Sequence, residues 1–91
     1  MAELSLSVEF GNLVRELRLA KKISQEEFAY KCGIHRTYMT HIERGTKMPS
    51  IDVVAKIARG FDVQISALFL GLENRGVTIE RITDQPASKW G

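Results

Sequence analysis

Two short helical patterns, residues 25–32 and 35–44, are separated by Gly33 and Ile34 alone, and this junction is the feature that most constrains the fold. The first pattern follows a capping box at residues 24–27, in which a serine precedes a glutamate by three positions. Gly33 ends it at a position that favours a left-handed residue. Because the connection is so short, the two helices must cross steeply, which leaves one face of the second helix uncovered.

Apolar side chains recur at steps of three and four in three further segments, which predicts three more helices. These span residues 9–21, a segment from Ser50 as N-cap to about residue 60, and residues 65–72. The side chains expected to face inward in the five helices are Phe10, Leu13, Val14, Leu17, Ala20, Phe28, Ala29, Cys32, Ile34, Met39, Ile42, Ile51, Val54, Ile57, Ala58, Leu68, Phe69 and Leu72.

The order of elements predicts an all-α, five-helix domain over residues 1–72, with a helix-turn-helix at 25–44. Residues 73–91 are expected to form a C-terminal extension, either a dimerisation element or a loose tail. Within it, the alternation of apolar and polar residues at 77–80 indicates a short strand.

The uncovered face of the 35–44 helix is polar and rich in hydrogen-bond donors. It carries Arg36, Thr37, Thr40, His41 and Arg44. The major groove of DNA admits one helix, and the first residues of the second helix reach base edges in this docking mode. We therefore predict base contacts by Arg36, Thr37 and His41.

Phosphate contacts are expected from the helix ends beside this face. Gln25 stands at the start of a helix, where free backbone amides attract anions. Arg44, Thr46 and Lys47 flank the end of the 35–44 helix, and Tyr38 is expected to lie against the sugar–phosphate backbone. The first sixty residues carry ten Lys and Arg against seven Asp and Glu. This excess is compatible with an ordinary solvated surface as well as with a surface that faces phosphates.

Several other classes of function are disfavoured. No nucleophile stands near a base at motif spacing, and no glycine-rich loop could cradle a phosphate, so we expect no enzyme and no cofactor. The single cysteine, Cys32, excludes an internal disulfide and a cysteine-rich zinc site. His35 and His41 have no further ligands at suitable spacing, so no metal is expected. No apolar run is long enough for a membrane helix, and we expect a cytoplasmic protein.

Taken together, these residues resemble the helix-turn-helix proteins of the Cro and lambda-repressor type, the XRE family. The resemblance covers about residues 10–69. The segments that carry it are Arg18, Ser24-Gln25-Glu26-Glu27-Phe28-Ala29, Gly33-Ile34, Ile42-Glu43-Arg44-Gly45, Pro49-Ser50, Ile57-Ala58 and Leu68-Phe69. The resemblance implies a lambda-repressor-like domain and a structural ion pair between Arg18 and Glu43. It also implies that Arg36, Thr37 and His41 fall at base-contact positions, and that Gln25, Thr40, Arg44 and Lys47 fall at or near phosphate contacts.

Residues 35–38 also resemble the small controller proteins of restriction–modification systems. The chain is thus expected to be a transcriptional regulator, bacterial or phage-encoded, that binds a pseudo-palindromic operator in double-stranded DNA as a homodimer. An antitoxin or another protein-interaction module, with a protein partner bound through residues 73–91, is the alternative. Three departures concern helix ends: the family usually has Ser, Thr or Asp at His35, Gly at Asp62, and a Ser or Thr cap at Gln64.

Overall fold

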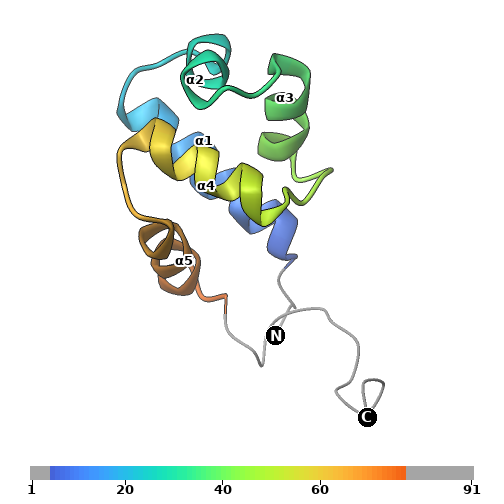
Figure 1. Ribbon diagram of the computed structural model, residues 1–91. Coiled ribbons are helices and arrows are strands. Elements are labelled where there is room, and N and C mark those ends of the chain that lie inside the picture. The colour runs from blue at the N-terminus through green and yellow to red at the C-terminus, as the bar shows by residue number, and fades with distance from the viewer. Residues whose placement is uncertain (1–4, 78–91) are drawn as a thin grey trace.

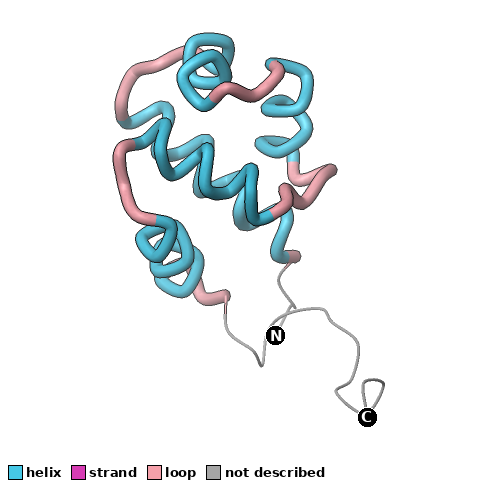
Figure 2. The backbone as a smooth tube through the Cα atoms, in the orientation of Figure 1, coloured by secondary structure: helices cyan, strands magenta, loops and turns pink. Residues whose placement is uncertain are grey.

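The computed structural model describes residues 5–77. Within this range the chain forms five α-helices and no strand (Figures 1 and 2). The helices are α1 (Leu6–Ala20), α2 (Gln25–Cys32), α3 (Arg36–Arg44), α4 (Ile51–Phe61) and α5 (Ile65–Asn74). The predicted all-α, five-helix fold is confirmed. The expected strand at 77–80 falls almost entirely outside the described residues, as does most of the extension 73–91.

Local side-chain chemistry sets most of the helix boundaries. The hydroxyl of Ser24 accepts a hydrogen bond from the backbone N–H of Glu27, 3.0 Å away, and Ser50 caps α4 in the same way. Gly33 and Gly45 end α2 and α3 with φ of +72° and +75°, the left-handed conformation that glycine adopts without steric cost. α2 therefore has the predicted limits, and α3 ends as predicted but begins at Arg36, one residue after the predicted start at His35.

Two helices are longer than expected. α1 begins at Leu6 rather than residue 9, because Ser5 accepts a hydrogen bond from the N–H of Val8 and starts the helix one turn earlier. α5 continues to Asn74, two residues beyond the expected end at Leu72. Asp62 takes the left-handed conformation at the end of α4, a role that glycine usually fills but that aspartate tolerates.

The core lies where α1 and α4 run across the middle of the molecule (Figure 1). α3 packs on α1, α2 packs on α4, and α5 packs on both α1 and α4. The rings of Phe28 and Phe61 stack at a centroid distance of 4.1 Å. The buried apolar residues are Phe10, Leu13, Val14, Phe28, Ala29, Cys32, Ile34, Met39, Ile42, Val54, Ile57, Ala58, Phe61, Leu68, Leu72 and Val77.

Three residues expected to face inward do not lie in the core. Ile51 is 62% exposed, Phe69 is 40% exposed, and Ala20 is also exposed. Ile51 is the first residue of α4 and Ala20 is the last residue of α1. Apolar periodicity identifies the inward face of a helix but not the length over which neighbours cover that face, and both residues lie beyond the covered part.

Gly11 permits a close approach between α1 and α3. A Cβ atom at this position would overlap the carbonyl oxygen of Ile42 and would lie 2.9 Å from that of Glu43. The absence of a side chain thus lets the backbone of the last turn of α3 pack directly on α1. This contact fixes α3 relative to the rest of the domain.

Candidate nucleic-acid interface

Helix α3 separates its side chains into a buried face and a free face. Met39, Ile42 and Glu43 are buried against the domain. The opposite side carries Arg36, Thr37, Thr40, His41 and Arg44, which together line one hollow of about 340 Å³. The structure therefore brings the three expected base-contact residues, Arg36, Thr37 and His41, onto one accessible surface.

His35 begins α3 although it is an unusual capping residue. Its imidazole Nδ1 accepts a hydrogen bond from the backbone N–H of Thr37 at 3.1 Å. This bond satisfies one of the donors that the first turn of a helix leaves free, which is the task that a Ser or Thr oxygen performs elsewhere. The departure from the family pattern at His35 thus leaves the start of α3 well defined. At Gln64, by contrast, no side-chain hydrogen bond caps α5.

Arg18 and Glu43 form a buried, two-pronged ion pair. The Arg18 Nε lies 2.7 Å from Glu43 Oε2, and its Nη2 lies 3.0 Å from Oε1. A third donor, Nη1, reaches the carbonyl oxygen of Ile23 at 2.8 Å. The hydrogen bond that Arg18 donates to Glu43 raises the pKa of Arg18 above its ordinary value, despite the opposing effect of burial. The ion pair that the family resemblance implies is therefore present, and it anchors the inner face of α3 to α1.

Gln25 and Thr40 use their side chains to join α2 to α3. The Thr40 hydroxyl donates to Gln25 Oε1 at 2.7 Å, and Gln25 Nε2 donates to Glu43 Oε1 at 3.1 Å. Both residues were expected to contact phosphates. Their side chains make these hydrogen bonds within the protein, and the backbone N–H of Gln25 lies in the first turn of α2, where the free N–H groups of a helix can bind an anion.

The other expected contact residues differ in their surroundings. Arg44, Thr46 and Lys47 are exposed, whereas Tyr38 is half-buried and packs against the core. The Thr46 hydroxyl donates to the carbonyl oxygen of His41 and also lies 3.1 Å from His41 Nδ1. Arg36 lies 3.8 Å from Glu26 with both side chains largely exposed, so this pair is weak and easily exchanged for another partner.

Arg15 is a candidate that the sequence reasoning missed. It lines a second hollow, of about 420 Å³, together with Arg18, Gln25, Glu43 and Arg44. Arg18 and Glu43 neutralise each other there, whereas Arg15 and Arg44 are exposed. A signal was available, because Arg15 lies one helical turn before Arg18 and therefore on the same side of α1.

Comparison with known proteins decides the family. Residues 14–68 match the protein family described as Helix-turn-helix. The chain belongs to this helix-turn-helix family. Control protein C.BamHI of Bacillus amyloliquefaciens is 48% identical over 56 residues, which are 60% of this chain and 69% of that protein. Control protein C.MunI of a Mycoplasma species is 36% identical over 69 residues, 75% of this chain and 93% of that protein.

Solved structures agree with these sequence relatives. The restriction-modification controller protein C.AhdI from Aeromonas hydrophila superimposes with a TM-score of 0.65 at 40% identity, covering 68% of this chain and 94% of that one. Wild-type controller protein C.Esp1396I gives a TM-score of 0.70 at 30% identity, with coverage of 76% and 90%. Other relatives carry the description HTH-type transcriptional regulator. This helix-turn-helix protein is a DNA-binding transcriptional regulator.

Two kinds of feature are absent from residues 5–77. No helix there is long and apolar enough to cross a membrane. The same part of the chain holds no group of three or more His, Cys, Asp or Glu side chains that could bind a metal ion.

Proposed function

We propose that this protein is a restriction–modification controller that binds a pseudo-palindromic operator as a homodimer. The observation that carries the proposal is the free face of α3, where Arg36, Thr37 and His41 share one hollow. The buried pair of Arg18 and Glu43 holds the opposite face, so the free face is presented rigidly. The restriction-modification context is supported by the names of the relatives and of the structural neighbour C.AhdI.

Arg36 and Thr37 occupy the first turn of α3, the part of a recognition helix that reaches base edges. An arginine there can donate two hydrogen bonds to O6 and N7 of guanine, and a threonine can touch the methyl group of thymine. His41 lies about one turn further along the same face. A base contact by His41 extends the recognised DNA sequence by a further base pair.

Phosphate contacts would come from the cations that border this face. Arg15 and Arg44 line one hollow, and their like charges repel each other unless an anion lies between them. A DNA phosphate is such an anion, and the N-terminus of α2 at Gln25 borders the same hollow. Lys47, in the exposed loop after α3, supplies a further cation. Weaker contacts with the DNA backbone are expected from Tyr38, Thr40 and Thr46, because their side chains are partly engaged within the protein.

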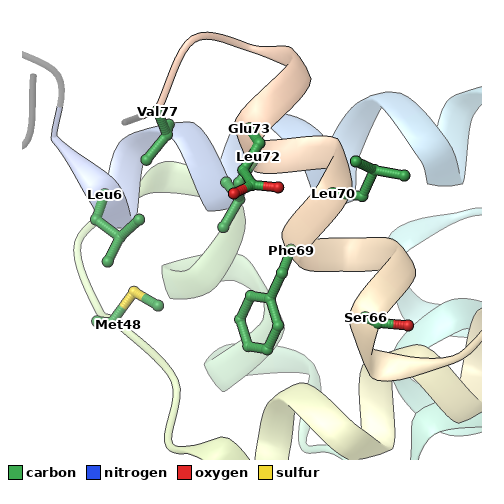
Figure 3. A pocket seen from close by; sticks show the side chains of 8 residues that line it. All are labelled: Leu6, Met48, Ser66, Phe69, Leu70, Leu72, Glu73 and Val77. Atoms are coloured by element: carbon green, nitrogen blue, oxygen red, sulfur yellow. The ribbon is translucent and has the colours of Figure 1, made fainter. Parts of the chain in front are cut away.

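A second copy of the chain is the proposed occupant of an apolar groove of about 450 Å³. The groove is lined by Leu6, Met48, Ser66, Phe69, Leu70, Leu72, Glu73 and Val77 (Figure 3). Leu70 is 57% exposed, and Met48 and Phe69 are also exposed, which is costly for large apolar side chains in water. A two-fold dimer would cover them and would double the number of base pairs read.

Selection of bound sequences from random duplexes tests this proposal. We expect an inverted repeat whose half-sites are about one helical turn, or ~34 Å, apart. The affinity for the selected duplex should fall steeply with salt, with a slope of about −0.9 in log K against log salt for each neutralised phosphate. Recovery of no preferred sequence would overturn operator binding, and recovery of a single unrepeated site would overturn the dimer.

A further inference from the structure

His41 and Thr46 form a closed hydrogen-bonded unit at the end of α3. The Thr46 hydroxyl donates to the carbonyl oxygen of His41, with 3.1 Å between the oxygens. The same hydroxyl oxygen lies 3.1 Å from Nδ1 of the His41 ring. Both contacts lie at the hydrogen-bond distance, and they connect the side chain that was expected to read a base to the loop that follows α3.

The two contacts share one hydroxyl proton, so the direction of one determines the direction of the other. With the Thr46 proton on the bond to the His41 carbonyl, the bond between Nδ1 and the Thr46 oxygen takes its proton from the ring. The opposite arrangement, in which the hydroxyl donates to Nδ1, places the ring proton on Nε2, and the tautomer measurement below distinguishes the two. In the neutral imidazole, a proton on Nδ1 leaves Nε2 as an acceptor.

We propose that Thr46 is a positioning residue that makes His41 Nε2 an acceptor, so that His41 reads the exocyclic amino group of adenine or cytosine. The proposal rests on operator binding through α3. It assigns to Thr46 a positioning role in addition to the proposed backbone contact, because its hydroxyl is engaged with His41.

The major groove explains why an acceptor selects these two bases. Adenine N6 and cytosine N4 present donors there, whereas guanine N7 and O6 and thymine O4 present acceptors. An acceptor at Nε2 would face an acceptor at guanine or thymine, and neither group would then be satisfied. The neighbouring Arg36 has the opposite preference, because a guanidinium group can donate hydrogen bonds but cannot accept them. The hollow lined by Arg36 and His41 thus offers donors at one position and an acceptor at the other.

His35 provides an internal control for the tautomer. Its Nδ1 accepts a hydrogen bond from the N–H of Thr37, so its proton lies on Nε2. The chain has two histidines, and they are expected to show opposite tautomers. Long-range ¹H–¹⁵N NMR of the free protein at neutral pH should show a protonated Nδ1 for His41 and a protonated Nε2 for His35. Thr46→Val should remove the tautomer preference of His41 without changing that of His35. Thr46→Ser, which keeps a hydroxyl, should retain the preference of His41.

Binding to DNA duplexes then tests which base His41 contacts. Sequence selection with the wild type and with His41→Ala should differ at one base pair per half-site, and the wild type should demand adenine or cytosine there. That base is next replaced by its analogue without the amino group, purine for adenine or pyrimidin-2-one for cytosine. Wild-type binding should weaken by about 3- to 10-fold, the range of one neutral hydrogen bond, and His41→Ala should show no further loss.

The outcomes separate this inference from the function on which it depends. Absence of operator binding by the wild type would overturn the proposed function, whatever the tautomer. Normal operator binding together with an Nε2–H tautomer at His41 would overturn the role of Thr46. Selection of guanine or thymine at the affected position, or equal loss of affinity in the wild type and His41→Ala on the analogue duplex, would overturn the reading of an amino group.

Discussion

Arg18 and Glu43 lie 25 positions apart in the chain and meet through two hydrogen bonds, of 2.7 and 3.0 Å, across the contact between α1 and α3. Each residue is less than one tenth exposed. A buried charge that loses its partner is left without the water that would otherwise solvate it. The pair therefore does more for the placement of α3 than a surface ion pair could do.

Replacement of Glu43 by Gln should destabilise the protein by about 3–5 kcal/mol, because the guanidinium of Arg18 is then left buried without a counter-charge. Urea unfolding measures this change in the free energy of unfolding. Glu26→Gln is the matched control, since Glu26 forms a weak and exposed pair and should change stability by less than ~1 kcal/mol. Equal effects of the two substitutions would contradict the anchoring role of Glu43.

Arg36→Ala should weaken operator binding by about 1–3 kcal/mol and relax the preference at one base pair in each half-site. The reason is the loss of two donors from the first turn of α3. Titration of wild-type and single-base-variant duplexes measures both effects. Lys56→Ala removes an exposed cation from α4 and should change neither the affinity nor the selected sequence by a comparable amount. An Arg36→Ala variant that still discriminates at every position would refute the assignment.

Arg15→Ala should weaken binding to DNA without changing which DNA sequence is preferred. If Arg15 neutralises one phosphate in each protomer, the slope of log K against log salt per half-site should become shallower by about 0.9. The selected operator should be unchanged, because phosphate contacts carry no direct sequence information. An unchanged salt slope would show that the hollow shared by Arg15 and Arg44 does not hold a phosphate.

Leu70→Glu tests the apolar groove as a dimer interface. A carboxylate on the exposed part of α5 would have to lose its water on association, so the variant should dissociate to monomers. Sedimentation equilibrium measures the change. Leu19→Glu is the control, because Leu19 is 52% exposed on α1 and does not line the groove. Dimers that persist in the Leu70 variant and disappear in the Leu19 variant would place the interface elsewhere.

Cys32 gives the stability a pH dependence at alkaline pH. Burial raises the pKa of its thiol from an ordinary value near 9 to about 11. Between these values the unfolded chain releases a proton that the folded chain retains, so stability present below pH 9 is lost as the pH rises towards 11. Between pH 9 and 10 the wild type should lose about 1 kcal/mol more than Cys32→Ala. Parallel losses in the two proteins, measured by urea unfolding, would contradict this assignment.

The features that the sequence predicted correctly depend on neighbouring residues. Ser24 and Ser50 cap helices through bonds that span three positions, and Gly33 and Gly45 end helices through their own conformation. These signals can be recognised in a single segment. They sufficed to delimit the helix-turn-helix and to place Arg36, Thr37 and His41 on one face.

The features that the sequence left undetermined depend on contacts between distant segments. Thr40 and Gln25 are 15 positions apart, and the hydrogen bond between their side chains joins two different helices. The exposure of Ile51 depends on where its neighbouring helices end. Arg15 and Arg44 share a hollow because α1 and α3 pack together. None of these contacts leaves a local pattern in the chain.

Gly11 has a practical consequence for engineering. Gly11 lets the main chain of α1 contact the last turn of α3 directly. The packing of α3 on the domain therefore does not use the side chains of Arg36, Thr37 or His41. These three positions can therefore be randomised together while the scaffold stays constant. Under the proposed base contacts, a library of this kind should contain variants with new target sites, provided that Gly11 itself is kept.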